Sequence, residues 1–177
     1  TGRSTFGAAV DGGRVFVFGG YDGSQDFNTT EALDLETRRF SRGPKMAVKQ
    51  YGCAAITIAP GRILVVGGCV DGTTEILDVE RMAFTSGPKT LSVRYGCAAI
   101  FLDARRLLVI GGLDTGQNTL ATTEVLHLDA MEFAPGPILN SPRRFCAAVA
   151  LGEDRLLVAG GQNGSGPLNS TEVHVET

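Results

Sequence analysis

The sequence predicts an all-β fold made of four repeats, and three observations support this prediction. A basic residue followed by four apolar residues and Gly-Gly occurs four times, each occurrence is followed by a polar loop that ends in Thr-Glu, and the spacing is nearly constant. The second glycines of the four pairs lie 48, 44 and 49 residues apart. Periods of this length are typical of β-propellers, in which every repeat forms one blade. The four stretches are residues 14–20, 62–68, 106–112 and 155–161.

Each apolar stretch predicts one strand of a hairpin. Four apolar residues are too few for a helix, and Val, Ile, Leu and Phe favour a strand that is buried on both faces. The glycines allow the backbone to turn where a Cβ would clash. Upstream of each stretch, an aromatic residue opens a run of small residues, and a turn-forming segment separates the two. We therefore expect the opening aromatic residues to be equivalent; they are Phe6, Tyr51, Tyr95 and Phe145.

The second half of each repeat predicts two more strands. In the first three repeats the Thr-Glu glutamate is followed nine residues later by a phenylalanine, and a Gly-Pro pair begins three residues after that. This spacing fits a strand, a tight turn and the start of a fourth strand. We expect the phenylalanines to pack between neighbouring sheets; they are Phe40, Phe84 and Phe133.

These motifs together resemble the kelch repeat, and the resemblance covers essentially the whole chain. It implies a kelch-type β-propeller, with four blades that are each a four-stranded antiparallel sheet. Two positions depart from the family pattern. The usual Tyr after the glutamate is replaced by Leu33, Leu77, Leu126 and His174, and phenylalanine stands where the family has Trp. Leucine and phenylalanine keep an apolar side chain at these places, so the prediction of the fold stands.

The repeats set blade boundaries within residues 1–177 at approximately 3–48, 49–93, 94–142 and 143–177. The last repeat ends at TEVHVET, so we expect the fourth blade to lack its outer strand. We interpret the chain as an excised or processed piece of a larger propeller, or as a compact four-bladed ring. Open edge strands attract other strands, so self-association through the end blades is expected.

Composition narrows the class of protein. The net charge of −3 and the 20% of charged residues argue against bulk nucleic-acid binding and against disorder. No run of apolar residues reaches the roughly 18 needed to span a membrane. Cysteines 53, 97 and 146 share one repeat position, and equivalent positions on neighbouring blades lie farther apart than the roughly 7 Å between Cα atoms that a disulfide needs. Buried free thiols predict a reducing, cytoplasmic compartment.

A search for chemistry yields no catalytic residue, no cofactor site and no metal site. The sequence has no P-loop, no H-E-x-x-H and no G-x-S-x-G motif, and its two histidines, His127 and His174, are one register apart on their strands. The Thr-Glu glutamates recur in all four repeats, which favours a structural hydrogen bond or ion pair over catalysis. They are Glu31, Glu75, Glu124 and Glu172.

The remaining candidate is one face of the propeller. In a four-stranded antiparallel blade the 2-3 loops and the 4-1 connections emerge together, and here they bring basic and aromatic residues to one mouth. Arginine pairs carboxylates well, so these residues predict a site for a protein or an acidic peptide; the kelch resemblance also implies a partner site on this face. The candidates are Arg3, Lys49, Gln50, Tyr51, Arg94, Tyr95, Arg143, Arg144 and Phe145. Equally, the arginines could fold back onto the blades and pair with the repeated glutamates.

The sequence therefore predicts a non-catalytic protein-interaction module, acting as a substrate adaptor or scaffold, with no nucleic-acid or membrane partner. Two alternatives stay open. One is a carbohydrate-active enzyme of oxidase or epimerase type built on the same blades, although no copper-binding constellation maps onto the chain. The other is a purely structural module that oligomerises through its open blade edges.

Overall fold

The structure, a computed structural model, describes residues 1–152 and 155–175 and consists of strands, turns and loops. Blade 1 contains β1 (Gly7–Asp11), β2 (Arg14–Phe18), β3 (Thr30–Asp34) and β4 (Arg39–Arg42). Blade 2 contains β5 (Ala54–Ala59), β6 (Arg62–Val66), β7 (Glu75–Asp78) and β8 (Ala83–Ser86). Blade 3 contains β9 (Ala98–Phe101), β10 (Arg106–Ile110), β11 (Thr123–His127) and β12 (Glu132–Pro135). Blade 4 contains β13 (Ala147–Ala150), β14 (Arg155–Ala159) and β17 (Thr171–Val175).

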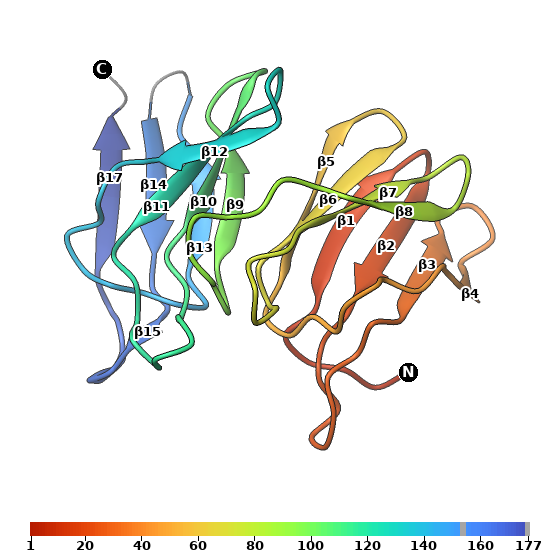
Figure 1. Ribbon diagram of the computed structural model, residues 1–177, viewed down its shortest axis with the longest axis horizontal. Helices are drawn as coiled ribbons and strands as arrows, with labels where there is room; N and C mark the ends of the chain where they lie inside the picture. Colours follow the sequence, from red (N-terminus) through yellow and green to blue (C-terminus); the bar gives the residue numbers. More distant parts are fainter. Residues whose placement is uncertain (153–154, 176–177) are drawn as a thin grey trace.

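Every blade is an antiparallel sheet in which consecutive strands pair, as in order β1-β2-β3-β4 of blade 1. Blade 4 has three strands, and its loop carries a small hairpin of β15 (Gln162–Asn163) and β16 (Gly166–Pro167). The blades follow one another in chain order from red to blue in Figure 1. The predicted all-β propeller with four blades, the last without an outer strand, is confirmed.

The blades pack face to face through side chains that alternate along each second strand. In blade 1, Phe16 and Phe18 point toward blade 2 and meet Ile63 and Val65 of β6 in one buried cluster. The alternate residues of β6, Leu64 and Val66, join β10 in a second cluster, and β10 joins β14 in a third. The strands β6 and β10 are therefore buried on both faces, which explains their continuous apolar sequence, whereas β2 and β14 bury one face more fully than the other.

The two outermost faces lack such a cover among the residues that the structure describes. Blade 1 presents Val10, which is 58% exposed, and Phe40, which is 64% exposed. Blade 4 presents Val149 at 51% and Val173 at 55% exposure. Phe84 and Phe133 occupy the position of Phe40 in their blades and pack into the first and second clusters, as predicted. Phe40 stays exposed because no blade precedes it in the described chain.

The repeat motifs hold each blade together locally. The Thr of Thr-Glu donates its hydroxyl to the carbonyl of the Pro in Gly-Pro, at 2.6 to 2.7 Å in the first three blades. The Gly of that pair donates its amide to the same threonine's carbonyl, as Gly43 does to Thr30 at 2.9 Å. A Cβ at residue 43 would overlap the threonine hydroxyl, so glycine is required there. The two motifs are thus one structural unit.

A chain of backbone hydrogen bonds runs around the axis where the first strands begin. The amides of Gly52, Gly96 and Phe145 donate to the carbonyls of Thr5, Gly52 and Gly96, respectively, at 2.7 to 2.8 Å. All four residues have φ between 51° and 69°. This pattern corrects the predicted equivalence of the four aromatic residues. Tyr51 and Tyr95 lie one residue before the positive-φ position, Phe145 lies in it, and Phe6 lies one residue after it.

Candidate functional site

The loop face of the propeller combines the variable loops with the starts of the first strands. The loops comprise residues 21–29, 69–73, 113–122 and 162–170, and each follows a Gly-Gly pair. Both glycines have a positive φ in all four blades, from 59° at Gly19 to 109° at Gly112. The predicted change from a rigid strand to a variable loop therefore occurs at these glycines.

Three arginines at this face extend into their blades and bind the repeated glutamates. Arg94 donates its Nε to Glu124 at 2.9 Å, and its Nη1 to the carbonyls of Gly111 and Thr122 at 2.8 and 2.7 Å. Its side chain is 1% exposed and that of Glu124 is 2% exposed. Arg143 makes the same contacts in blade 4, with Glu172 at 2.6 Å. Each guanidinium thus fastens the Gly-Gly turn to the third strand.

Blade 1 repeats this arrangement through Arg3, which donates Nη2 to Glu31 at 2.9 Å and Nη1 to the Gly19 carbonyl at 2.7 Å. The glutamates also accept backbone amides from the connection that enters their blade. In blade 3 the amides of Leu91 and Ser92 donate to Glu124 at 2.7 and 2.9 Å. A buried carboxylate with several such donors satisfies its hydrogen-bonding capacity. Glu75, Glu124 and Glu172 therefore join consecutive blades as well as the strands of one blade.

Blade 2 lacks the arginine. Gln50 occupies its place, and Nε2 of Gln50 donates to Glu75 at 3.4 Å, a long hydrogen bond. The amides of Ala47 and Val48 supply the other donors to Glu75. The Cys69 thiol donates to the Thr73 carbonyl at 3.0 Å. This carbonyl is equivalent to the one that the arginine contacts in the other blades, such as that of Thr122 in blade 3. Glu75 is thus a carboxylate, 3% exposed, without a cationic partner among the described residues.

These contacts place four of the nine candidate residues inside the blades. Gln50, Arg94 and Arg143 are buried, and the Arg3 side chain is 3% exposed. Their guanidinium and amide groups contact the glutamates and loop carbonyls, so they do not project into the mouth. One signal in the sequence could have identified them as one set: each stands four residues before the first residue of the first strand. The alternative in which the arginines fold back onto the glutamates describes Arg3, Arg94 and Arg143.

The other five candidates lie at the mouth. Lys49 and Phe145 are exposed, while Tyr51, Tyr95 and Arg144 are half-buried. Arg144 holds its guanidinium over the Phe145 ring, 5.8 Å from the ring centroid. The Phe145 ring also covers Gly96, where a Cβ would overlap the ring. The first strands of blades 2, 3 and 4 thus bring these side chains to one face.

Tyr21 belongs to this group, although no sequence motif distinguishes it. It follows the Gly-Gly pair of blade 1, and its ring centroid lies 5.8 Å from that of Tyr51. The Tyr51 centroid lies 6.3 Å from that of Tyr95. The three tyrosines of the chain therefore form a continuous tyrosine row across blades 1 to 3. Aromatic side chains with a polar end are enriched where proteins bind partners.

A cavity of about 360 Å³ opens beside this row. Tyr95 and Lys49 line it together with Asp26 from the blade 1 loop and Asp71 from the blade 2 loop. Burial raises the pKa of the Tyr95 phenol, and the Cys69 thiol and both carboxylates raise it further. Hydrogen bonds from Thr73 lower the pKa of Asp71 to about 2. The Asp71 carboxylate is thus ionised at neutral pH.

The cysteines match the predicted arrangement. Cys53, Cys97 and Cys146 occupy one position around the axis, and all four cysteines of the chain are free thiols. Burial raises the pKa of Cys53 and Cys97 to about 12. Within residues 1–152 and 155–175, no group of three His, Cys, Asp or Glu side chains could hold a metal ion. The same residues contain no helix long and apolar enough to cross a membrane.

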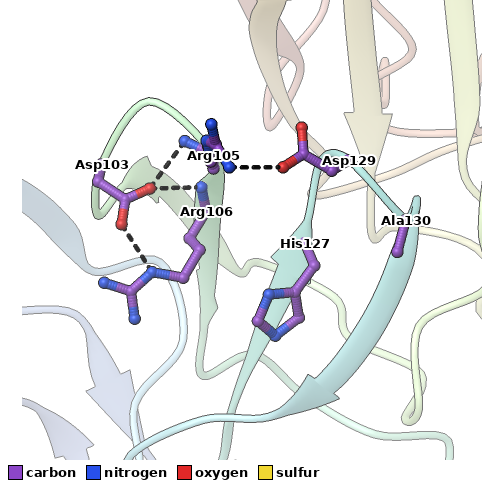
Figure 2. A pocket seen from close by; sticks show the side chains of 6 residues that line it. All are labelled: Asp103, Arg105, Arg106, His127, Asp129 and Ala130. Atoms are coloured by element: carbon purple, nitrogen blue, oxygen red, sulfur yellow. Dashed lines mark hydrogen bonds and ion pairs between the residues drawn. The ribbon is translucent and has the colours of Figure 1, made fainter.

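A second cavity, of about 380 Å³, lies on the opposite face at the turns of blade 3 (Figure 2). Asp103 accepts the backbone amides of Arg105 and Arg106 and the Nε of Arg106, at 2.7 to 2.8 Å. Arg105 pairs with Asp129 at 3.4 Å, and the exposed His127 lines the same cavity. These contacts stabilise the two turns locally, and this turn face serves as a comparison for the loop face.

The repeated blades, their internal Arg–Glu pairs and the shared loop face define a β-propeller built from repeat units. Residues 2–47, which comprise blade 1 and the connection that leaves it, match the family described as Kelch motif. No curated protein matches the chain. The other three blades carry the same Gly-Gly and Thr-Glu elements at the same structural positions. Blade 1 thus carries a kelch motif, and the chain as a whole folds as a four-bladed β-propeller.

Proposed function

We propose that this protein is a non-catalytic interaction module that binds a partner protein at the loop face, as an adaptor or scaffold. A kelch propeller supports a protein-interaction role in general. The observation that carries the proposal is the half-buried tyrosine row beside a cavity, with Tyr51 and Tyr95 in the segments that lead into β5 and β9. Interface residues that dominate binding are enriched in Tyr, Trp and Arg, and they act best when their position is fixed in advance.

The binding residues in this proposal are Tyr21, Tyr51, Tyr95 and Arg144, with Phe145 at the edge. The expectation of an acidic peptide depended on free guanidinium groups at the mouth. Arg3, Arg94 and Arg143 direct their guanidinium groups to internal glutamates. Lys49 and Arg144 are the basic groups that support an acidic partner at this face.

Selection from a random peptide display library tests the proposal. We expect enriched peptides that bind the wild-type protein and lose at least about tenfold in affinity for the Tyr51→Ala/Tyr95→Ala variant. The melting temperature should change little, because both rings are half-buried at the surface. His127→Ala on the turn face is the matched control and should bind as wild type does. Equal loss in both variants, or none in either, would contradict the proposal.

A second candidate function, self-association, is favoured by the uncovered end faces. In blades 2 to 4, one side of the sheet packs against the preceding blade, and blade 1 leaves this side exposed. Blade 4 leaves exposed the side that packs against a following blade in blades 1 to 3. We propose that blade 4 of one copy docks on blade 1 of a second copy. Sedimentation velocity should show a concentration-dependent dimer or larger species that Val149→Lys abolishes. A single monomer at all concentrations would refute this candidate.

We propose a cytoplasmic location, because four free thiols are consistent with a reducing compartment. Co-localisation of a tagged full-length chain with a cytosolic marker tests the assignment. Accumulation in the secretory pathway, with the thiols oxidised, would contradict it.

A further inference from the structure

The exposed charges near the tyrosine row indicate what kind of partner fits it. The charged side chains that line the cavity are two carboxylates, Asp26 and Asp71, and one ammonium, Lys49. Asp26 accepts no hydrogen bond and forms no ion pair with any residue that the structure describes. Among the charged side chains that line the cavity, carboxylates outnumber ammonium groups two to one, and Lys89, outside the lining, lies 3.7 Å from Asp71.

Asp71 is only partly engaged by the chain itself. Its Oδ1 accepts the amide of Thr73 at 3.0 Å, which leaves Oδ2 with a distant contact to Lys89 at 3.7 Å. Both Asp71 and Lys89 are well exposed, at 49% and 67% of their side chains, so water screens this pair. The Oδ2 atom thus remains available to a stronger donor from outside.

The aromatic surface lies close to both carboxylates. Tyr95 lines the cavity with Asp26 and Asp71, which come from different loops, and Tyr51 extends the surface toward Tyr21. A cation over an aromatic face is attracted by the ring, and a carboxylate beside it adds a charge-assisted hydrogen bond. Guanidinium groups satisfy both requirements at once, because they are planar and carry donors in a fixed fork.

We infer that the loop-face cavity binds a basic side chain, Arg or Lys, of an extended partner segment, with its charged group against Tyr95 and between Asp26 and Asp71. This inference rests on the proposed function and names the partner's chemistry. Lys49 lines the same cavity and forms no ion pair within the described residues, so it competes with an incoming cation. An acidic partner would instead need Lys49, and the two possibilities thus predict opposite effects of its removal.

The test uses three capped peptides that differ only in charge: GSGRGRGSG, GSGEGEGSG and GSGQGQGSG. Titration of the whole protein, followed by NMR or calorimetry, should show binding of the arginine peptide with a dissociation constant below about 1 mM and at least tenfold weaker binding of the other two. Asp26→Asn/Asp71→Asn should reduce the arginine peptide's affinity at least tenfold. Lys49→Ala should raise it about threefold, since a competing cation is removed.

Asp129→Asn, an exposed carboxylate on the turn face, is the control and should leave all three affinities unchanged. Preference for the glutamate peptide, with affinity lost in Lys49→Ala, would overturn the inference and leave the proposed function intact. If no peptide binds, or if a neutral oligosaccharide binds the tyrosine row instead, the inference is also overturned. Failure of the display selection as well would reject the proposed function itself.

Discussion

Replacing Arg94 by Gln tests the claim that the repeated arginines are internal supports of the blades. The substitution removes a guanidinium, 1% exposed at the side chain, that makes four hydrogen bonds: one to Glu124, two to the carbonyls of Gly111 and Thr122, and one to the Thr122 hydroxyl. The amides of Leu91 and Ser92 still donate to Glu124. The carboxylate then remains buried without its counter-charge.

Breaking a buried ion pair by removing one partner costs about 3 to 5 kcal/mol. Glutamine can retain one contact with the carboxylate, as Gln50 does with Glu75, so we expect the lower end of this range. For a chain of this size, about 3 kcal/mol corresponds to a fall in Tm of roughly 6 to 12 °C. Urea unfolding followed by far-UV circular dichroism measures the free energy, and calorimetry measures Tm.

Arg105→Gln is the matched control, because the Arg105 side chain is 79% exposed and pairs with an exposed aspartate. It should change stability by less than about 0.5 kcal/mol. A loss of under about 1 kcal/mol for Arg94→Gln would refute the structural role of the arginine. So would a wild-type Tm combined with lost peptide binding.

Three further predictions concern the other buried groups. Gln50→Arg should stabilise the protein by about 1 to 2 kcal/mol, because it supplies Glu75 with the cation that the other blades have; a destabilised variant in urea would contradict this. Burial raises the pKa of Glu172, but hydrogen bonds from Arg143 and two amides outweigh it and leave the pKa below 4.5. Its stabilising contribution is therefore complete above pH 4.5 and is lost as the pH falls through the lowered pKa, so Glu172→Gln should flatten the acid limb of the stability curve. The thiol of Cys97, with its pKa raised to about 12 by burial, should resist alkylation in the folded protein and react on unfolding, as mass spectrometry can show; rapid native labelling would refute this.

The repeat architecture was predictable from the sequence because its signals are local. Gly-Gly, Thr-Glu and Gly-Pro each fix a turn or a hydrogen bond within one blade, and their spacing sets the four sheets. The register of the first strand was harder to predict, because the repeats were aligned by their aromatic residues, which do not occupy equivalent positions. Ser4, Tyr51, Tyr95 and Arg144 share one position, as the bridges of Ser4 to Tyr21, Tyr95 to Leu113 and Arg144 to Gln162 demonstrate, so aromatic character does not mark it.

For the candidate site, the sequence predicts which face of the propeller carries it, but not which side chains are exposed there. Periodic arginines are expected whether they bind a partner or support the blade, and the choice depends on carbonyls and glutamates that the fold brings from about 17 to 30 residues away. Tyr21 lies in a loop whose length varies between blades, so no sequence register relates it to Tyr51. Only the three-dimensional arrangement places their rings 5.8 Å apart.

The affinity of a display-selected peptide for Tyr51→Ala/Tyr95→Ala, measured together with the Tm of the variant, decides whether the loop face is the partner site. We expect at least about tenfold weaker binding at a Tm within about 2 °C of wild type, because the tyrosine row contacts the partner and contributes little to the core. Unchanged affinity would contradict the claim that the loop face is the partner site. A large fall in Tm would show instead that the tyrosines, like the arginines, serve the fold.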